Sequence, residues 1–255
     1  MTRTGIDLDG KKALVTGASR GIGRAIAVGF AEAGADVALL ARAKDALDEV
    51  RAEIEQIGRR AVVLPCDVTD AGAVGDAVGG AIAGLGQVDV LVNNAGGTNF
   101  MVPFTEMRFS GWEKTMRMNA ASAVHVCQAL SGHMLERGTG SVINVASVAG
   151  LVGTPAGAHY AASKAALISL TKTLAVEWAA AGVRVNALCP GWTATELNRD
   201  LWADEETSAQ LLAGVPMARW GDVREMVAPA VFLASDASSY VTGQTLVADG
   251  GQTAT

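Results

Sequence analysis

The sequence predicts an α/β fold in which a doubly wound, seven-stranded parallel sheet carries helices on both faces. Two observations indicate this fold. Short apolar runs alternate with helical patterns along the whole chain, which is typical of parallel strands covered on both sides. The chain has 255 residues, 50% of them hydrophobic, and no repeat, low-complexity segment or linker divides it. We therefore expect a single domain over residues 1–255, long enough to bury a sizeable core.

The predicted strands are the apolar runs that stand before turn or helix signals. They cover residues 13–15, 36–41, 61–64, 88–92, 141–145, 183–188 and 245–248. The first helix follows the first strand over residues 24–32 and ends at Gly34. The capping box Ser110-Gly-Trp-Glu113 predicts the start of a helix that runs to about Glu136. Pro155 and Gly182 bound a further predicted helix over about 156–180. Asp222-Val-Arg-Glu225 is a similar but weaker capping box.

A glycine-rich turn joins the first strand to the first helix. It runs from Thr16 to Gly23, and its glycines are spaced Gly-x-x-x-Gly-x-Gly rather than G-x-G-x-x-G, the usual dinucleotide fingerprint. Glycines there let a pyrophosphate approach the backbone, where it meets the free N–H groups and the positive dipole end of the helix. The strand–turn–helix context therefore predicts a phosphate-binding site.

Ser147, Tyr160 and Lys164 form the most informative set in the chain. Tyr160 and Lys164 are four residues apart, just over one helical turn, so they share a helix face, and Ser147 lies thirteen residues before Tyr160. At about 5 Å and an effective dielectric near 20, an ammonium attracts a tyrosinate by roughly 3 kcal/mol. The spacing thus predicts a lowered pKa of Tyr160 and acid–base chemistry near neutral pH. The alternative is a buried tyrosine beside a solvated lysine.

Together with further motifs, these residues resemble the short-chain dehydrogenases/reductases over about residues 8–251. The matching residues are Thr16 to Gly23, Asp67-Val68, Asn93-Asn94-Ala95-Gly96, Asn119, Ser147, Tyr160, Lys164 and Pro190-Gly191. The resemblance implies a Rossmann fold and an oxidoreductase that transfers a hydride between a nicotinamide and a carbonyl or secondary alcohol. It implies that Tyr160 is the acid/base and that Ser147 stabilises the carbonyl oxygen. It also implies that Lys164 lowers the pKa of Tyr160 and holds the nicotinamide ribose, while Asn119 holds a water that relays protons.

The same resemblance implies a cofactor site. Its residues are Gly17, Ser19, Arg20, Gly21, Ile22, Gly23, Arg42, Asp67, Val68, Asn94, Ala95, Gly96, Tyr160, Lys164, Pro190, Gly191 and Thr193. In the family's pattern, Asp67 and Val68 hold the adenine, and the Asn94 segment lines the nicotinamide side.

The end of the second strand distinguishes NADP(H) from NAD(H). An NAD enzyme of this architecture carries an acidic residue there, about 20 residues past the glycines, to hold the ribose 2′-hydroxyl. This chain carries Arg42 instead, and Arg20 sits in the glycine turn, from which it could reach a 2′-phosphate. Because arginine pairs with a 2′-phosphate, we expect NADP(H) rather than NAD(H). Two solvated surface arginines are the alternative.

The substrate is a small molecule, with two candidate classes. The chain is similar to gluconate or sugar dehydrogenases and to 3-oxoacyl-[acyl-carrier-protein] reductases. Gly157 stands where the acyl reductases usually carry glutamine, and Ala181 stands where they often carry a basic residue. A small polyol, keto or sugar-acid substrate is therefore favoured, with a 3-oxoacyl thioester as the alternative.

The resemblance also implies a lid over the site, at about residues 192–220. This segment holds three tryptophans and four leucines, which are Trp192, Trp202, Trp220, Leu197, Leu201, Leu211 and Leu212. They either enclose an apolar substrate or pack on the body of the protein.

Composition argues against several other classes. A net charge of −6 gives no electrostatic footprint for nucleic acid, and no apolar stretch of about 18 residues predicts a membrane span. The three histidines show no metal-like pattern, so no metal site is expected. Residues 1–9 lack the apolar core of a signal peptide. We expect a cytoplasmic protein whose dispersed cysteines are buried thiols, namely Cys66, Cys127 and Cys189.

Two other functions fit part of the sequence. The glycine turn also matches the G-x-S-x-G nucleophile elbow of a hydrolase, but that mechanism needs an acid-paired histidine later in the chain, and the last histidine is His159. A cofactor-sensing protein that has lost catalysis is the second alternative. The complete set of Ser147, Tyr160 and Lys164 argues against it.

The helices near residues 111–136 and 156–180 are apolar on more than one side. The residues concerned are Val124, Val126, Ala129 and Met134 on the first helix and Ala162, Ala166, Leu170 and Leu174 on the second. A helix that is apolar over much of its circumference is buried on more than one side. The resemblance implies that both helices pair with their copies across a twofold axis. We expect a homotetramer of 222 symmetry, with a dimer, or cover by loops of the same chain, as alternatives.

Overall fold

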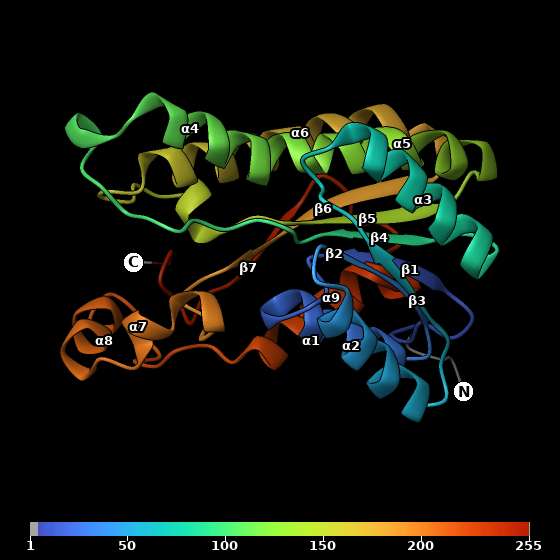
Figure 1. The fold of residues 1–255 in the computed structure, drawn as a ribbon, viewed down its shortest axis with the longest axis horizontal. Helices are drawn as coiled ribbons and strands as arrows, with labels where there is room; N and C mark the ends of the chain where they lie inside the picture. Colours follow the sequence, from blue (N-terminus) through green and yellow to red (C-terminus); the bar gives the residue numbers. More distant parts are fainter. Residues whose placement is uncertain (1–4, 255) are drawn as a thin grey trace.

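Seven parallel strands form one sheet, in the order β3-β2-β1-β4-β5-β6-β7 (Figure 1). The computed structural model describes residues 5–254, so residues 1–4 and 255 of the predicted domain lie outside the described residues. The strands are β1 (Lys12–Thr16), β2 (Asp36–Ala41), β3 (Ala61–Pro65), β4 (Val90–Asn93), β5 (Gly140–Val145), β6 (Val183–Pro190) and β7 (Thr245–Ala248). The prediction of a doubly wound, seven-stranded parallel sheet is confirmed.

The strand order reverses at β1, which pairs with β2 on one side and β4 on the other. In sheets of this kind, ligands bind at the carboxyl ends of the strands beside such a reversal. Four of the predicted site residues follow the carboxyl ends of four central strands, namely Gly17 after β1, Arg42 after β2, Asn94 after β4 and Ser147 after β5. The topology therefore gathers them at one edge of the sheet.

Two layers of helices cover the sheet (Figure 1). One face carries α3 (Ala71–Leu85), α4 (Phe109–Met116), α5 (Ser122–Arg137) and α6 (Ala158–Trp178), and the other carries α1 (Gly21–Glu32), α2 (Lys44–Gln56) and α9 (Val227–Ala234). Each face has its own core, because the strands are buried on both sides. Ile26 and Phe30 of α1 belong to one buried cluster, and Leu130 and Met134 of α5 belong to the other.

β4 begins two residues later than predicted. The backbone N–H of Val88 donates to His133 Nε2 at 3.1 Å. The carboxylate of Asp89 accepts from the backbone N–H of Lys12 at 2.8 Å and from Arg137 at 2.6 Å. These partners lie at the amino edge of the sheet, so Val88 and Asp89 form a loop tied by side chains before the ladder begins.

The helix predicted from the Ser110–Glu113 box to Glu136 consists of three segments. α4 begins at Phe109, because the carbonyl of Arg108 accepts from the backbone N–H groups of Gly111 (2.9 Å) and Trp112 (3.3 Å). Ser110 is thus inside the first turn, and the prediction that it caps the helix was wrong. A π-helical turn over Arg117–Ala121, which contains Asn119, then separates α4 from α5. Such turns widen a helix locally and often stand at functional sites.

The helix of Tyr160 and Lys164 keeps its predicted end but starts later. Ala156 has a φ of 59°, in the left-handed region, so α6 begins only at Ala158. Gly182, with a φ of 74°, ends the run that follows α6, as predicted. The Asp222–Glu225 capping box is also confirmed, since Asp222 Oδ1 accepts from Arg224 N at 2.7 Å and Glu225 Oε2 accepts from Asp222 N at 2.8 Å.

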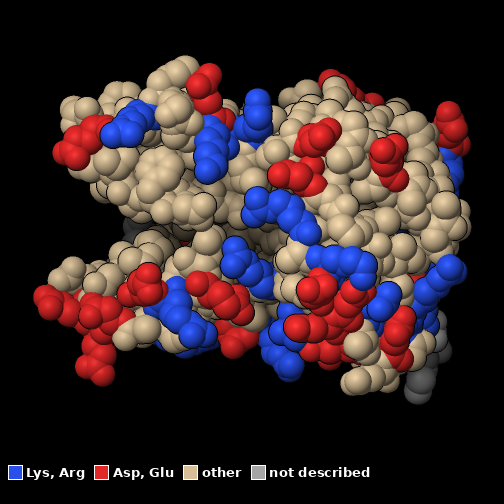
Figure 2. Space-filling model, in the orientation of Figure 1, with Lys and Arg blue, Asp and Glu red and all other residues tan. Residues whose placement is uncertain are grey.

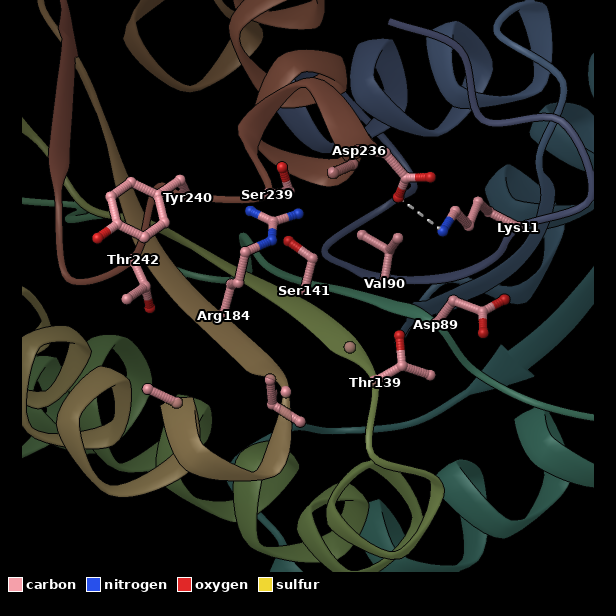
Figure 3. A pocket seen from close by; sticks show the side chains of 15 residues that line it. Lys11, Asp89, Val90, Thr139, Ser141, Arg184, Asp236, Ser239, Tyr240 and Thr242 are labelled. Carbon is pink, nitrogen blue, oxygen red and sulfur yellow. Dashed lines mark hydrogen bonds and ion pairs between the residues drawn. The ribbon is translucent and has the colours of Figure 1, made fainter. Parts of the chain in front are cut away.

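A cavity of about 560 Å³ opens at the amino ends of β4, β5 and β6, away from the predicted site (Figure 3). Lys11 pairs with Asp236 there at 3.1 Å. Arg184 donates to Ser238 Oγ at 2.8 Å and to the carbonyl of Ser235 at 3.1 Å. The charged groups of this cavity thus bind the chain itself and tie the turn after α9 to the sheet.

The three cysteines are free and buried, as predicted. Burial raises the pKa of Cys127 to about 12, so this thiol stays protonated. Within residues 5–254, no group of three or more His, Cys, Asp and Glu side chains is arranged to hold a metal ion. No helix in the same range has the length and apolar character needed to span a bilayer.

Candidate active site

The glycine turn closes tightly on the loop after β4. Gly17 and Gly21 have φ values of 66° and 57°, a region that favours glycine. A Cβ on Gly17 would lie 2.7 Å from Asn94 Nδ2, and one on Gly23 would overlap the same atom and the carbonyl of Gly17. Two features therefore require glycine here, which are the left-handed backbone and the close approach to Asn94.

Asn94 and Thr16 hold this turn in place. Asn94 Nδ2 donates to the carbonyls of Thr16 (3.0 Å) and Gly17 (3.3 Å). Thr16 Oγ1 accepts from the backbone N–H groups of Asn94 and Ala95, both at 3.0 Å. Asn94 therefore fixes the shape of the predicted phosphate-binding turn. The side chains of Ser19 and Ile22 remain partly exposed at the turn, and Arg20 is exposed.

Arg42 and Asp67 lie at the carboxyl ends of the neighbouring strands β2 and β3. The backbone there is joined by the bond from Cys66 N to the carbonyl of Ala41, at 3.0 Å. The pKa of Asp67 is lowered, first by the N–H and hydroxyl of Thr69 and also by the charge of Arg42. Val68 is buried, and its carbonyl lies 3.1 Å from His125 Nδ1. The predicted adenine-side residues are thus together, with an exposed arginine beside them.

Ser147, Tyr160 and Lys164 meet at the carboxyl end of β5. Ser147 stands two residues after this strand, and the other two lie in the first turns of α6. The Ser147 side chain is near enough to Tyr160 to act on the pKa of its hydroxyl. Lys164 is buried and donates from Nζ to the carbonyl of Val145 at 2.8 Å, and this nitrogen lies 5.8 Å from the centre of the Tyr160 ring. The structure therefore brings together the three residues that the sequence grouped.

The predicted lowering of the Tyr160 pKa is wrong. Burial raises the pKa of Tyr160 above its ordinary value, and the hydrogen bond with Ser147 only opposes this shift. Burial also lowers the pKa of Lys164 to about 8. The sequence argument assumed a partly solvated pair in contact. In the fold, the ammonium is instead bound to a backbone carbonyl, and both groups are desolvated.

Asn119 links three elements beside these residues. Its Oδ1 accepts from the backbone N–H of Gly97 at 2.8 Å, and its Nδ2 donates to Ser163 Oγ at 2.9 Å. The hydroxyl of Ser163 donates in turn to the carbonyl of Tyr160 at 2.7 Å. A Cβ on Gly96 would lie 2.7 Å from Asn119 Oδ1 and 3.5 Å from Lys164 Nζ, so this predicted site residue also lies at the centre of the site.

The segment predicted as a lid begins and ends at one place. Gly221 N donates to the carbonyl of Trp192 at 2.8 Å, and Thr193 pairs with Gly221 in an isolated bridge. The rings of Trp192 and Trp220 pack edge to face, 5.5 Å apart. Between these ends lie α7 (Arg199–Trp202) and α8 (Glu205–Leu212), apart from the two helical layers (Figure 1).

Contacts near Gly97 and Gly21 connect this segment to the loop after β4 and to the glycine turn. A Cβ on Gly97 would lie 2.8 Å from Leu197 Cδ2, and one on Gly21 would lie 3.7 Å from Thr195 Cγ2. Pro190 and Gly191 precede the segment, and Gly191 packs against Asp249, where a Cβ would lie 2.7 Å from its Cα. Figure 2 shows the molecule hollowed between the layer of α4 and α6 and the part formed by α7 and α8, with Lys and Arg side chains near the inner end of the hollow.

Sequence reasoning missed one group of residues beside Tyr160. His159, the residue before it, is fully buried and contacts Thr98 and Phe100 in the loop after β4. Met101 of the same loop packs against Gly157. The only signal in the sequence was the position of His159 next to Tyr160. Its partners are about sixty residues away, and no spacing rule connects them.

Comparison with known proteins agrees with this architecture. A family model described as enoyl-(acyl carrier protein) reductase matches residues 17–253. The gluconate 5-dehydrogenase of Gluconobacter oxydans (strain 621H) is 43% identical over 246 residues, which cover 96% of each chain. The 3-oxoacyl-[acyl-carrier-protein] reductase of Thermotoga maritima is 38% identical over 244 residues, which cover 96% of this chain and 98% of that one.

A solved structure extends the similarity to three dimensions. It is a gluconate 5-dehydrogenase from Burkholderia cenocepacia J2315 in complex with NADP and tartrate, with a TM-score of 0.94 at 39% identity. The similarity covers 99% of this chain and 98% of that one. The matches in sequence and in structure therefore both span nearly the whole chain. This chain belongs to the short-chain dehydrogenase/reductase family of oxidoreductases.

Proposed function

We propose that the protein is an NADP(H)-dependent oxidoreductase that transfers a hydride between the nicotinamide and a carbonyl or secondary alcohol, with small sugar acids or polyols as substrates. The observation that carries the proposal is the meeting of Ser147, Tyr160 and Lys164 at the carboxyl end of β5. The carboxyl end of β5 lies two strands away from the glycine turn after β1, at the same edge of the sheet.

The residues of the glycine turn fit a dinucleotide. Positive φ values at Gly17 and Gly21 and the absence of side chains there leave backbone N–H groups open at the start of α1. We propose that these groups hold the pyrophosphate, that Asp67 and Val68 hold the adenine, and that a third set borders the nicotinamide. This third set comprises Asn94, Ala95, Gly96, Pro190, Gly191 and Thr193. When bound, the nicotinamide supplies or accepts the hydride.

Tyr160 is the proposed acid/base. Its raised pKa keeps the hydroxyl protonated at neutral pH, which is the form that gives a proton to a carbonyl oxygen. Ser147, whose side chain already acts on the pKa of Tyr160, is proposed to stabilise negative charge on the same oxygen. Lys164, whose pKa of about 8 leaves it charged at neutral pH, holds the nicotinamide ribose. Asn119 is the proposed holder of a water for proton relay, and its bonds to Ser163 and Gly97 fix its position beside Lys164.

Two exposed arginines support NADP(H) over NAD(H). Arg42 follows β2, where an NAD enzyme would carry an acid, and Arg20 lies in the glycine turn. The charge of Arg42 acts on Asp67, which is one of the residues proposed to hold the adenine, so the two side chains are neighbours. The similar gluconate 5-dehydrogenase of Burkholderia cenocepacia was solved with NADP.

The contact between Met101 and Gly157 favours a small sugar acid over an acyl thioester. A Cβ on Gly157 would lie 2.9 Å from Met101 Cε and 2.8 Å from Thr154 Cγ2. The glutamine that the acyl reductases usually carry here would therefore displace the Met101 side chain. The similarity to gluconate 5-dehydrogenase points the same way. A 3-oxoacyl thioester reductase is the second candidate, because the Thermotoga maritima relative has that activity in its name.

We further propose a homotetramer in which α5 and α6 meet their copies. Val126 and Met134 are buried within the chain, but the other predicted interface residues of the two helices are half-buried or exposed, and Val176 on α6 is 82% exposed. The free, buried thiols suit a reducing compartment, and we propose the cytoplasm.

A substrate screen with both coenzymes tests the function. The purified protein is assayed for NADP⁺ reduction with gluconate and other sugar acids and polyols, and for NADPH oxidation with ketones and 3-oxoacyl thioesters. We expect turnover with sugar acids and NADP(H). Turnover of thioesters alone would select the second candidate, and NADP(H) binding without turnover of any compound would select a cofactor-sensing protein.

A further inference from the structure

His159 has an unusual position for a side chain that sequence reasoning gave no role. It lies in the first turn of α6, directly before Tyr160, and its exposed fraction is 0%. Its Nε2 lies 3.0 Å from Thr98 Oγ1. Its ring stacks on Phe100, with the ring centres 4.2 Å apart and the planes 3° from parallel. Both contacts go to the loop over residues 97–102, which we call the 97–102 loop.

The hydrogen bonds of Thr98 determine which nitrogen of His159 carries the proton. The Thr98 hydroxyl donates its single proton to the carbonyl of Phe100 at 2.8 Å. It must therefore accept from His159, so the ring donates from Nε2–H. His159 Nδ1 is buried and has no hydrogen-bond partner within residues 5–254. Among the described residues, the hydrogen bond to Thr98 is thus the only one that compensates the burial of this ring.

Hydrogen bonds to Asn119, Ala156 and His159 fix the 97–102 loop to the body of the protein, and its Phe100 and Met101 also pack near Gly111 and Gly157. At its start, Gly97 N donates to Asn119 Oδ1 at 2.8 Å. At its end, Val102 N donates to the carbonyl of Ala156 at 2.8 Å. Between them the loop has no regular secondary structure, and His159 provides both the bond to Thr98 and the stack on Phe100.

The loop lies beside the start of α6, where Tyr160 stands. It begins after Gly96, where a Cβ would lie 3.5 Å from Lys164 Nζ, and its Met101 packs on Gly157 just before α6. Phe100 and Met101 are still 37% and 48% exposed, so part of each apolar side chain is open to solvent. A shift of this loop would move both side chains relative to the start of α6, while Thr16 and Asn94 continue to hold the glycine turn.

We propose that His159 is a positioning residue that sets substrate affinity by holding the 97–102 loop at a fixed distance from Tyr160. This inference rests on the proposed function, because it assigns Phe100 and Met101 to the wall of the substrate site. It predicts that loss of the contacts between His159 and the loop, which we call the tether, weakens binding of the substrate and leaves binding of the coenzyme unchanged.

Four variants of the full-length protein separate the two contacts. His159→Phe keeps a flat ring for Phe100 and removes the hydrogen bond. Thr98→Val removes the same bond from the loop side, and His159→Phe/Thr98→Val combines the two. His159→Gln keeps a donor and loses the stack. His133→Phe is the matched control, since it removes a 3.1 Å bond from a helix histidine to the backbone of Val88, away from the site.

With gluconate as the probe, His159→Phe and Thr98→Val should each raise KM for gluconate about threefold to tenfold, the size of one hydrogen bond, with KM for NADP⁺ within about twofold of wild type. The KM for gluconate of the double variant should be no higher than that of His159→Phe. The KM of His159→Gln should lie between those of wild type and His159→Phe. His133→Phe should keep wild-type KM values. Independent, multiplying effects of the two substitutions, or unchanged KM for gluconate in both, would overturn the proposal.

Hydrogen exchange of the backbone tests the tether without turnover. Peptides that span residues 97–102 should take up deuterium faster in His159→Phe and Thr98→Val than in wild type, and at the wild-type rate in His133→Phe. Unchanged uptake in both site variants would overturn the proposal. If wild type does not oxidise gluconate, the substrate part of the proposed function has failed, and the exchange result alone decides on the tether.

Discussion

The ammonium of Lys164 is turned toward the backbone and not toward the hydroxyl of Tyr160. Its Nζ donates to the carbonyl of Val145 at 2.8 Å and stands 5.8 Å from the centre of the Tyr160 ring. Burial dominates both groups, so that the pKa of Tyr160 is raised and that of Lys164 is lowered to about 8. The hydroxyl of Tyr160 thus stays protonated at neutral pH, and Lys164 is a buried charge bonded to one carbonyl.

Removal of the Tyr160 hydroxyl should abolish catalysis and spare coenzyme binding. Tyr160→Phe keeps the ring and its packing but has no proton to transfer. Because general acid–base catalysis contributes roughly 10²–10⁴-fold, we expect kcat to fall by about three decades. Steady-state kinetics measures the fall, and a fluorescence titration with NADPH serves as the control for binding. A kcat within about tenfold of wild type would refute the role of Tyr160.

Stability should depend on the protonation of Lys164. Its folded-state pKa of about 8 lies below the ordinary 10.5, so between these values the unfolded chain binds one more proton than the folded chain. The free energy of unfolding of wild type, relative to Lys164→Met, should therefore rise as the pH increases from about 8 to 10.5. Urea unfolding of both proteins at several pH values in this window measures the difference. A difference that stays constant with pH would contradict the buried charge.

Coenzyme preference should reverse when the charge at position 42 is inverted. Arg42→Asp replaces a group that attracts the 2′-phosphate by one that repels it and can accept from a 2′-hydroxyl. We expect wild type to bind NADPH more tightly than NADH, and the variant to bind NADH more tightly. Titration of both proteins with both coenzymes is the test. Tighter binding of NADH by wild type would sink the assignment of Arg42.

A methyl group on Gly23 should disturb the turn that Asn94 closes. A Cβ there would overlap Asn94 Nδ2 and the carbonyl of Gly17, and overpacking of this kind costs typically about 1–3 kcal/mol. We expect Gly23→Ala to lower the melting temperature and to weaken NADPH binding. Gly79→Ala is the matched control, because a Cβ at this α3 position meets nothing within 4 Å, and it should stabilise the helix by up to about 1 kcal/mol. Equal behaviour of the two variants would argue against a tight turn.

The protein should assemble into a tetramer. Val176 on α6 is 82% exposed, and Ala129 on α5 is exposed as well, although both helices already face the sheet of their own chain. Copies paired across twofold axes would cover these surfaces. Light scattering at micromolar protein should give about four times 26.0 kDa. A mass of one chain would count decisively against this assembly, and a mass of two would support the dimer.

Several parts of the site could be predicted because each depends on residues close together in sequence. The strand before the glycine turn, the turn itself and the helix behind it are contiguous, and Tyr160 and Lys164 share a helix face by their spacing alone. The apolar runs also identified all seven strands, since the central strands are buried on both faces and have no polar side, and the edge strands β3 and β7 are mostly apolar as well.

The remaining features depend on contacts between distant residues, which only the tertiary structure decides. Thr98 and His159 are 61 positions apart, and Asn119 and Ser163 are 44 positions apart, yet each pair shares a hydrogen bond. The π-helical turn at Asn119 has no pattern in its own sequence. The direction in which the pKa of Tyr160 shifts was also decided by packing. Desolvation by the surrounding fold outweighed the charge attraction between tyrosinate and ammonium that the Tyr160–Lys164 spacing suggested. The sequence thus determined which groups the site contains and on which strands and helices they lie. Their burial, their hydrogen-bond partners and the resulting protonation were decided by how the sheet edge and α6 close around them.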